Sequence, residues 1–189
     1  MKIINLHLNN DLLLSLVCKK DRRAQEQLYQ LFAPKMLSVC RYYLKSLPKA
    51  EEAMLNGFLK VFQNIESFKN EGSFEGWIRQ IMVRECLSMI RIQAKLQLFS
   101  DEKQPFDIQK VEPHDALEYD YYQSLIDALP DGYRVVFVLY CIEGYKHQEI
   151  AKILNIKIGT SKSQLNRARQ MLQTQIKKDN HSNYVVTKI

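Results

Sequence analysis

The chain has 189 residues, of which 46% are hydrophobic and 25% are charged. This composition is typical of a globular protein with a buried core, and it excludes a wholly disordered or collagen-like chain. Glycine and proline are scarce, with 6 and 5 residues. Few turn formers and many long side chains favour helices over a many-stranded sandwich, so we expect an all-α protein.

No segment is long and apolar enough for a membrane span. The longest apolar run, Val135 to Ile142, is eight residues long, whereas a spanning helix needs about 20. Asn9, Asn10 and Asp11 interrupt the N-terminal stretch, so we do not expect a secretory signal. We predict a cytoplasmic protein without membrane insertion, whose four widely spaced cysteines are free thiols rather than disulfides or zinc ligands.

The net charge of +6 is unevenly distributed along the chain. Residues 1–100 hold 15 basic and 9 acidic groups, residues 101–117 hold 2 and 5, and residues 118–178 hold 9 and 6. Two basic blocks are thus separated by an acidic strip. Basic blocks favour a polyanionic partner such as a nucleic acid, although a solvated surface can have the same composition.

Apolar residues recur every three or four positions over long segments of the first basic block, which predicts amphipathic helices that pack together. Ser73 is a suitable N-cap for the last of them, with Glu75 in its first turn. The predicted helices run from about Arg23 to Lys45, from Lys49 to Ser67 and from after Ser73 to about Lys95, preceded by a weaker pattern over 11–19.

The stretch from Phe99 to Asp115 has no regular period and contains Pro105 and Pro113, so we predict a flexible, extended linker. Shorter helical patterns follow at 117–129, 133–142, 148–154 and 160–177. Together these patterns predict two small helical domains joined by the linker. The predicted divisions are a first domain (1–98), an acidic linker (99–116), a second domain (117–178) and a C-terminal tail (179–189).

The last two helical patterns have the spacing of a helix-turn-helix. Ala151 provides the small side chain that a close helix crossing needs, and Asn155 lies at the turn, where we expect a left-handed backbone. The second helix is predicted to open at Gly159-Thr160, with Thr160 as its cap. Its inward face is formed by Ser161, Leu165, Ala168 and Leu172.

The opposite face of this second helix carries side chains that can bind base edges, since arginine pairs with guanine, and asparagine or glutamine with adenine. No acidic residue lies between Glu149 and Asp179, a stretch with seven lysines and arginines, as a phosphate-facing surface requires. A merely solvated basic helix is the alternative. The predicted DNA-binding residues are Thr160, Lys162, Ser163, Asn166, Arg167, Arg169 and Gln170.

These motifs, with Leu129-Pro130, Arg134-Val135-Val136-Phe137 and Glu143-Gly144-Tyr145, resemble the C-terminal domain of bacterial sigma factors. The short chain resembles the two-domain extracytoplasmic-function (ECF) class. The resemblance implies that the helix-turn-helix binds the minus-thirty-five promoter element. Asn155 stands where glycine is usual, and Gln164 stands where the family often has arginine, a change expected to remove a phosphate or base contact.

The segment from Ala50 to Phe62 resembles the helix with which sigma factors dock on the coiled coil of the largest polymerase subunit. The family usually has Asp, Gln and Glu near Glu52, Asn56 and Gly57, so Gly57 is interpreted as a lost carboxylate. An exposed helix start is the alternative explanation for the acids. The resemblance assigns polymerase binding to Glu51, Glu52, Asn56, Phe58 and Phe62.

The segment from Phe68 to Ile78 resembles the part of a sigma factor that opens the minus-ten element. An extruded base needs a ring to stack on, and backbone phosphates need cations. We interpret Trp77 as core or as both core and DNA-contacting, and a solvated polar face is the alternative for the helix that follows. The predicted residues for minus-ten binding and melting are Phe68, Lys69, Phe74, Trp77, Gln80, Arg84 and Arg91.

The sequence contains neither a glycine-rich phosphate loop nor an H-E-x-x-H motif. We therefore expect no cofactor, no bound metal and no enzymatic activity. The resemblance covers roughly residues 10–178 and implies core RNA polymerase and promoter DNA as partners; an anti-sigma factor stays open as a further one. The alternatives are a stand-alone helix-turn-helix regulator with an N-terminal sensing bundle, and a helical adaptor.

Overall fold

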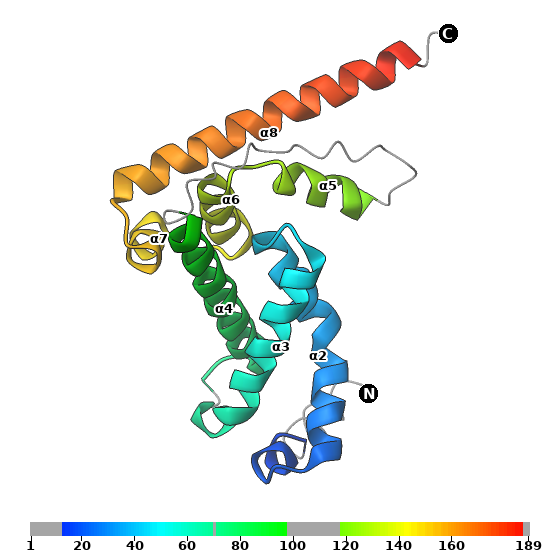
Figure 1. Ribbon diagram of the computed structural model, residues 1–189, viewed down its shortest axis with the longest axis vertical. Helices are drawn as coiled ribbons and strands as arrows, with labels where there is room; N and C mark the ends of the chain where they lie inside the picture. The colour runs from blue at the N-terminus through cyan, green and yellow to red at the C-terminus, as the bar shows by residue number, and fades with distance from the viewer. Residues whose placement is uncertain (1–12, 70, 98–117, 187–189) are drawn as a thin grey trace. The chain divides into compact units, whose positions relative to one another are not determined.

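The computed structural model describes residues 13–69, 71–97 and 118–186, and all regular structure in these ranges is helical (Figure 1). The expectation of an all-α protein is therefore confirmed. The chain divides into two compact units, Met1–Lys103 and Gln104–Ile189. The predicted linker, 99–116, lies outside the described residues.

Three long helices form the first unit, and each packs against the other two (Figure 1). They are α2 (Arg22–Tyr43), α3 (Leu47–Gln63) and α4 (Phe74–Gln97); a 3-10 turn, η1 (Ile65–Ser67), follows α3, and residues 13–18 are also helical. The core consists of side chains that are 2% exposed or less: Val17, Leu28, Met36, Val39, Cys40, Tyr43, Ala50, Ala53, Phe58, Val61, Ile78, Met82 and Cys86.

Local capping explains where these helices begin. Asp21 Oδ1 accepts a hydrogen bond from Ala24 N at 2.8 Å and starts α2. The helix α3 begins before the predicted Lys49, because Pro48 fits a first helical turn, where its missing N–H is not needed. Ser73 Oγ accepts from Gly76 N at 3.0 Å, so Ser73 caps α4 as predicted.

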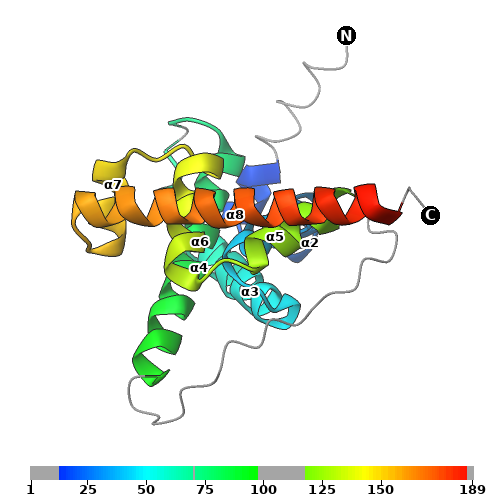
Figure 2. The ribbon, with the colours of Figure 1, turned by 90° about the horizontal axis from the view of Figure 1, so that it is seen from above.

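The second unit contains α5 (Glu118–Asp127), α6 (Asp131–Phe137), a π-helical turn η2 (Val138–Ile142), α7 (His147–Leu154) and α8 (Ile158–Val186). In Figure 2, α8 runs from α7 past α6 to α5, and it contacts all three. The core of this unit consists of side chains that are 5% exposed or less: Leu125, Leu129, Val136, Val138, Leu139, Ile150, Leu165 and Ala168.

A buried arginine connects the end of α5 to the start of α6. Arg134 is 2% exposed, pairs with Asp131 at 2.9 Å and donates to Leu129 O at 3.4 Å. The helix α6 therefore begins at Asp131, ahead of the predicted start at Tyr133. The negative charge of Asp131 in the first turn also interacts favourably with the helix dipole.

The helix α8 is longer than predicted at both ends. Ser161 N bonds to Lys157 O at 3.1 Å, so the helix begins at Ile158. Thr160 thus lies inside the first turn, and its predicted role as the cap is wrong. At the other end α8 continues to Val186, beyond the predicted end at Lys177.

Candidate nucleic-acid interface

The helices α7 and α8 form the predicted helix-turn-helix. Asn155 ends α7 in the left-handed conformation, with φ 53° and ψ 49°, as predicted. Ile156 N then bonds to Ala151 O at 3.0 Å, which completes a C-terminal cap of the kind that usually uses glycine. Ala151 is 8% exposed and Ser161 is fully buried, so two small side chains occupy the interior of the motif.

His147 joins the start of α7 to α8 and to η2. Its Nδ1 lies 2.9 Å from Ser161 Oγ, and its ring stacks on Tyr140 with 4.6 Å between ring centroids. Burial, and after it the charges of Lys162 and Arg169, lower the pKa of His147 below 6.5. The hydrogen bond runs from the Ser161 hydroxyl to Nδ1 or from Nδ1–H to the hydroxyl oxygen, according to the tautomer of the ring.

The outward face of α8 is polar, basic and solvent-exposed. Six of the predicted DNA-binding residues lie there, while Thr160 is half-buried. The opposite face is buried at Ser161, Leu165 and Ala168 and half-buried at Leu172. The fold thus places these exposed side chains on one helix face: Lys162, Ser163, Asn166, Arg167, Arg169 and Gln170.

Two tyrosines contact the arginines of this face, and the sequence analysis missed both. Arg167 Nη1 donates to Tyr133 OH of α6 at 3.1 Å. The Arg169 guanidinium lies 5.6 Å from the Tyr140 ring centroid of η2, and its Nη2 lies 3.9 Å from Cys141 Sγ. Periodicity places a residue on a helix face but does not identify its tertiary partner, so the sequence held no signal for these contacts.

Gln164, at the position where the family often has arginine, lies at the border of the exposed face of α8. Its side chain is half-buried, and its Nε2 would lie 3.3 Å from a Cβ added to Gly132. Gln164 therefore packs against the start of α6. The expectation that glutamine here removes a phosphate or base contact stays a prediction.

The aromatic residues predicted for the minus-ten element form one cluster at the start of α4. Phe74 stacks on Trp77 at 5.7 Å, and Phe68 meets Phe74 edge-on at 5.0 Å. Phe32 of α2 joins from the other side, 5.8 Å from Phe74. All four side chains are half-buried, which agrees with the interpretation of Trp77 as a residue that is only partly core. Lys69 is exposed beside the cluster.

The helix α4 continues from this cluster with a polar outer face. Gln80, Arg84 and Arg91 are exposed, whereas Ile78 and Met82 on the inner face are fully buried. The structure thus brings together the aromatic cluster and the first part of a basic helix face, as a surface for unpaired DNA requires.

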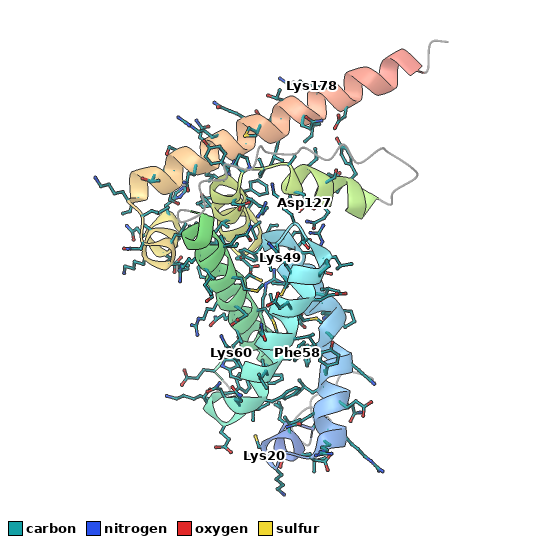
Figure 3. The ribbon with its side chains drawn as sticks, in the orientation of Figure 1. Lys20, Lys49, Phe58, Lys60, Asp127 and Lys178 are labelled. Atoms are coloured by element: carbon teal, nitrogen blue, oxygen red, sulfur yellow. The ribbon has the colours of Figure 1, made fainter. Side chains whose placement is uncertain are left out.

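The outer face of α3 is the predicted polymerase surface, and the structure alters its membership. Glu51 and Glu52 are exposed, and Asn56 and Phe62 are half-buried. Phe58 is 2% exposed and packs edge-on against Tyr29 of α2 at 4.9 Å (Figure 3). Phe58 is therefore a core residue that supports α3 from within, and its prediction as a contact residue is corrected.

Two leucines that the sequence analysis did not select lie on the same outer face. Leu55 is 55% exposed and Leu59 is 56% exposed. Glu51, Leu55 and Leu59 follow the four-residue spacing of one helix face, and Glu52 lies three residues before Leu55 on the same side.

Gly57 lies on the opposite side of α3, against α4. A Cβ added to Gly57 would lie 2.3 Å from Met82 Sδ, so the two helices cross closely at this point. A carboxylate at position 57 would point into the core. The interpretation of Gly57 as a lost polymerase-binding carboxylate is therefore wrong.

An ion pair beside this crossing also connects α3 and α4. Lys60 Nζ pairs with Glu85 Oε2, and Glu85 is only 9% exposed (Figure 3). Lys60 itself remains largely exposed. The pair adds a polar contact between α3 and α4 beside their apolar interface.

No described helix is both long enough and apolar enough to cross a bilayer. No cluster of three His, Cys, Asp or Glu side chains in the described ranges is suited to hold a metal ion.

The fold and these surfaces define an all-helical DNA-binding protein with a helix-turn-helix in its second unit. The family model described as Sigma-70 region 2 matches residues 28–96, and the one described as Sigma-70, region 4 matches residues 119–172. The protein belongs to the sigma-70 family, and within it to the ECF class.

Two curated relatives and one solved structure show the extent of the similarity. The ECF RNA polymerase sigma factor SigE of Mycolicibacterium smegmatis is 30% identical over 138 residues, which cover 68% of this chain and 52% of the relative. SigW of Bacillus subtilis is 29% identical, covering 85% and 93%. The sigma factor RpoE of Bartonella quintana, solved with the anti-sigma factor NepR, superposes with a TM-score of 0.56 at 23% identity, covering 80% and 96%.

Proposed function

We propose that this protein binds core RNA polymerase, directs it to specific promoters and helps to open the start site. The observation that carries the proposal is the outward face of α8, which presents three cations and two amide side chains on a helix-turn-helix. The curated relatives, named RNA polymerase sigma factors, support the same conclusion. The protein itself performs no catalytic step in this proposal, and it acts in the cytoplasm.

The second unit is proposed to bind the minus-thirty-five element through α8. A helix fits the major groove, where Arg167 can pair with guanine and Asn166 or Gln170 with adenine. Lys162 and Arg169 are positioned for phosphates at the edges of the same face. Because no acid occurs in the sequence between Glu149 and Asp179, the phosphate backbone meets no nearby opposing charge on this helix.

The first unit is proposed to bind and open the minus-ten element. The half-buried rings of Phe68, Phe74 and Trp77 already pack on one another, so their remaining exposed surface is held in place. A base that leaves the duplex can stack there, with a gain of about 1–3 kcal/mol per stacked base. Lys69 and Arg84 supply charge for the strand backbone.

The outer face of α3 is proposed to bind the polymerase coiled coil. Leu55 and Leu59 provide exposed apolar contact area, and Glu51 and Glu52 provide charge at one end. This combination suits a helical partner with apolar and basic side chains. An anti-sigma factor, such as the one solved with the Bartonella quintana protein, also belongs to the proposed partners.

The proposal is tested by titrating promoter DNA with the protein, with and without core polymerase, and by probing unpaired thymines with permanganate. Each unit alone offers a small DNA interface, so the free protein should bind DNA weakly and with strong salt dependence. Core polymerase should create specific binding and open DNA. Tight specific binding by the free protein, with no opening after core is added, would instead indicate a stand-alone regulator.

A variant pair tests the proposed role of α8. Arg167→Ala should cost about 1–3 kcal/mol of promoter binding, concentrated at one or two base pairs. Lys177→Ala is the control, because Lys177 is an exposed cation beyond the predicted contact residues of the same helix. The assay measures holoenzyme binding to promoters with single base-pair changes. An equal loss across all of them for Arg167→Ala would reduce Arg167 to a phosphate contact.

A further inference from the structure

The strongest unassigned feature of the DNA-facing surface is the contact between Arg167 and Tyr133. Arg167 lies on the exposed face of α8, and its Nη1 donates to the Tyr133 hydroxyl at 3.1 Å. The two residues are 34 positions apart in the sequence. The contact therefore depends on the packing of α6 against α8.

Tyr133 is the fixed member of the pair. It is half-buried at the start of α6, next to Arg134, which is 2% exposed and bound to Asp131 and Leu129. The helix α6 packs against α8, and Gln164 of α8 lies close to Gly132 on the other side of Tyr133. Arg167 is exposed and gains its position from the tyrosine, not the reverse.

One hydrogen bond to the tyrosine leaves most of the guanidinium available. Arginine has five N–H donors in a planar fork, and a guanine base takes two of them. A free arginine loses much of its side-chain freedom when it binds a base, whereas a guanidinium that is already held loses less. A held arginine also presents its donors in one orientation, which favours one base over the others.

We propose that Tyr133 is a positioning residue for promoter recognition: its hydroxyl holds Arg167 so that the remaining guanidinium donors face a single base pair of the minus-thirty-five element. This inference rests on the proposed function, and it concerns selectivity rather than the presence of DNA binding. Tyr133 itself need not contact DNA.

The test uses Tyr133→Phe, which removes only the hydroxyl and keeps the half-buried ring. Holoenzyme binding is measured with promoters that differ at single base pairs of the minus-thirty-five element. Tyr133→Phe should reduce discrimination at the base pair read by Arg167 by about 2- to 12-fold, the range for ordering one long side chain. Binding to promoters already altered at that base pair should change little. Tyr122→Phe on α5 is the control and should leave all values unchanged.

The double variant Tyr133→Phe with Arg167→Ala separates positioning from a general structural role. Once Arg167 is absent, loss of the Tyr133 hydroxyl should have no further effect on discrimination. An equal effect of Tyr133→Phe with and without Arg167, or unchanged discrimination in the single variant, overturns the proposal. Failure of the wild-type holoenzyme to discriminate between promoters would refute the proposed function instead.

Discussion

The close crossing at Gly57 gives a sharp test of the packing between α3 and α4. In Gly57→Ala, the new Cβ would lie 2.3 Å from Met82 Sδ and 2.9 Å from Met82 Cε. Met82 is fully buried, so its thioether can move only by displacing other core atoms. Overpacking of this kind costs about 1–3 kcal/mol, while alanine in place of a helical glycine gains about 1 kcal/mol. The expected net loss is therefore up to about 2 kcal/mol.

The measurement is urea unfolding followed by tryptophan fluorescence. Trp77 is the single tryptophan of the chain and lies in the first unit, so its signal reports that unit alone. The matched background is Met82→Ala, which removes the colliding atoms at a cost of about 2–5 kcal/mol. Gly57→Ala should stabilise this background, so its effect changes sign. Equal stabilisation of about 1 kcal/mol in both backgrounds would refute the packing argument.

The same geometry predicts the outcome of placing a carboxylate on α3. Gly57→Glu would insert a charge between two packed helices, so it should unfold the first unit at lower urea concentration and weaken polymerase binding. Leu55→Glu puts the same charge on the exposed outer face and should leave stability nearly unchanged. Urea unfolding of both variants checks their stability, and titration of core polymerase with Gly57→Glu checks its binding. Leu55→Glu is a control for stability alone, because Leu55 lies on the proposed polymerase-binding face. Normal stability of Gly57→Glu would contradict the assignment of Gly57 to the core.

Three further predictions concern titration, thiol reactivity and turn geometry. Because the folded state lowers the pKa of His147 below 6.5, the unfolded chain binds more protons in acid. The second unit should therefore lose stability as the pH falls below about 6.5. In His147→Gln, the melting temperature should depend less on pH than in the wild type. An equal pH dependence in both proteins would contradict this. A hydrogen bond with Cys40, and burial, raise the pKa of Cys86. Cys40 is itself buried, so both thiols should react with an aromatic disulfide reagent far more slowly than the exposed Cys141; equal rates would contradict the packing. Asn155→Ala should destabilise the second unit by about 1 kcal/mol, because alanine tolerates the left-handed region poorly, whereas Asn155→Gly should not. Thermal unfolding followed by circular dichroism compares the two variants. Equal melting temperatures would refute the turn argument.

Much of the fold and part of the candidate site follow from local sequence patterns. The apolar period of the long helices, the cap at Ser73 and the left-handed turn at Asn155 depend on residues near each other in the chain, so each is readable from a short window. The exposed face of α8 is predictable for the same reason, because helical geometry alone separates Arg167 from Ser161.

The tertiary structure decided what depends on which helix lies opposite. Phe58 and Leu55 are both apolar residues on α3, yet one is buried against Tyr29 and the other is exposed. From the sequence alone, Gly57 is interpreted as a lost carboxylate, whereas the structure shows that Met82 of α4 occupies the space beside it. The sequence by itself determined the helices and the exposed basic face of α8. Packing between distant segments determined which residues of α3 are buried and which tyrosine contacts Arg167, because such contacts leave no periodic trace in the chain.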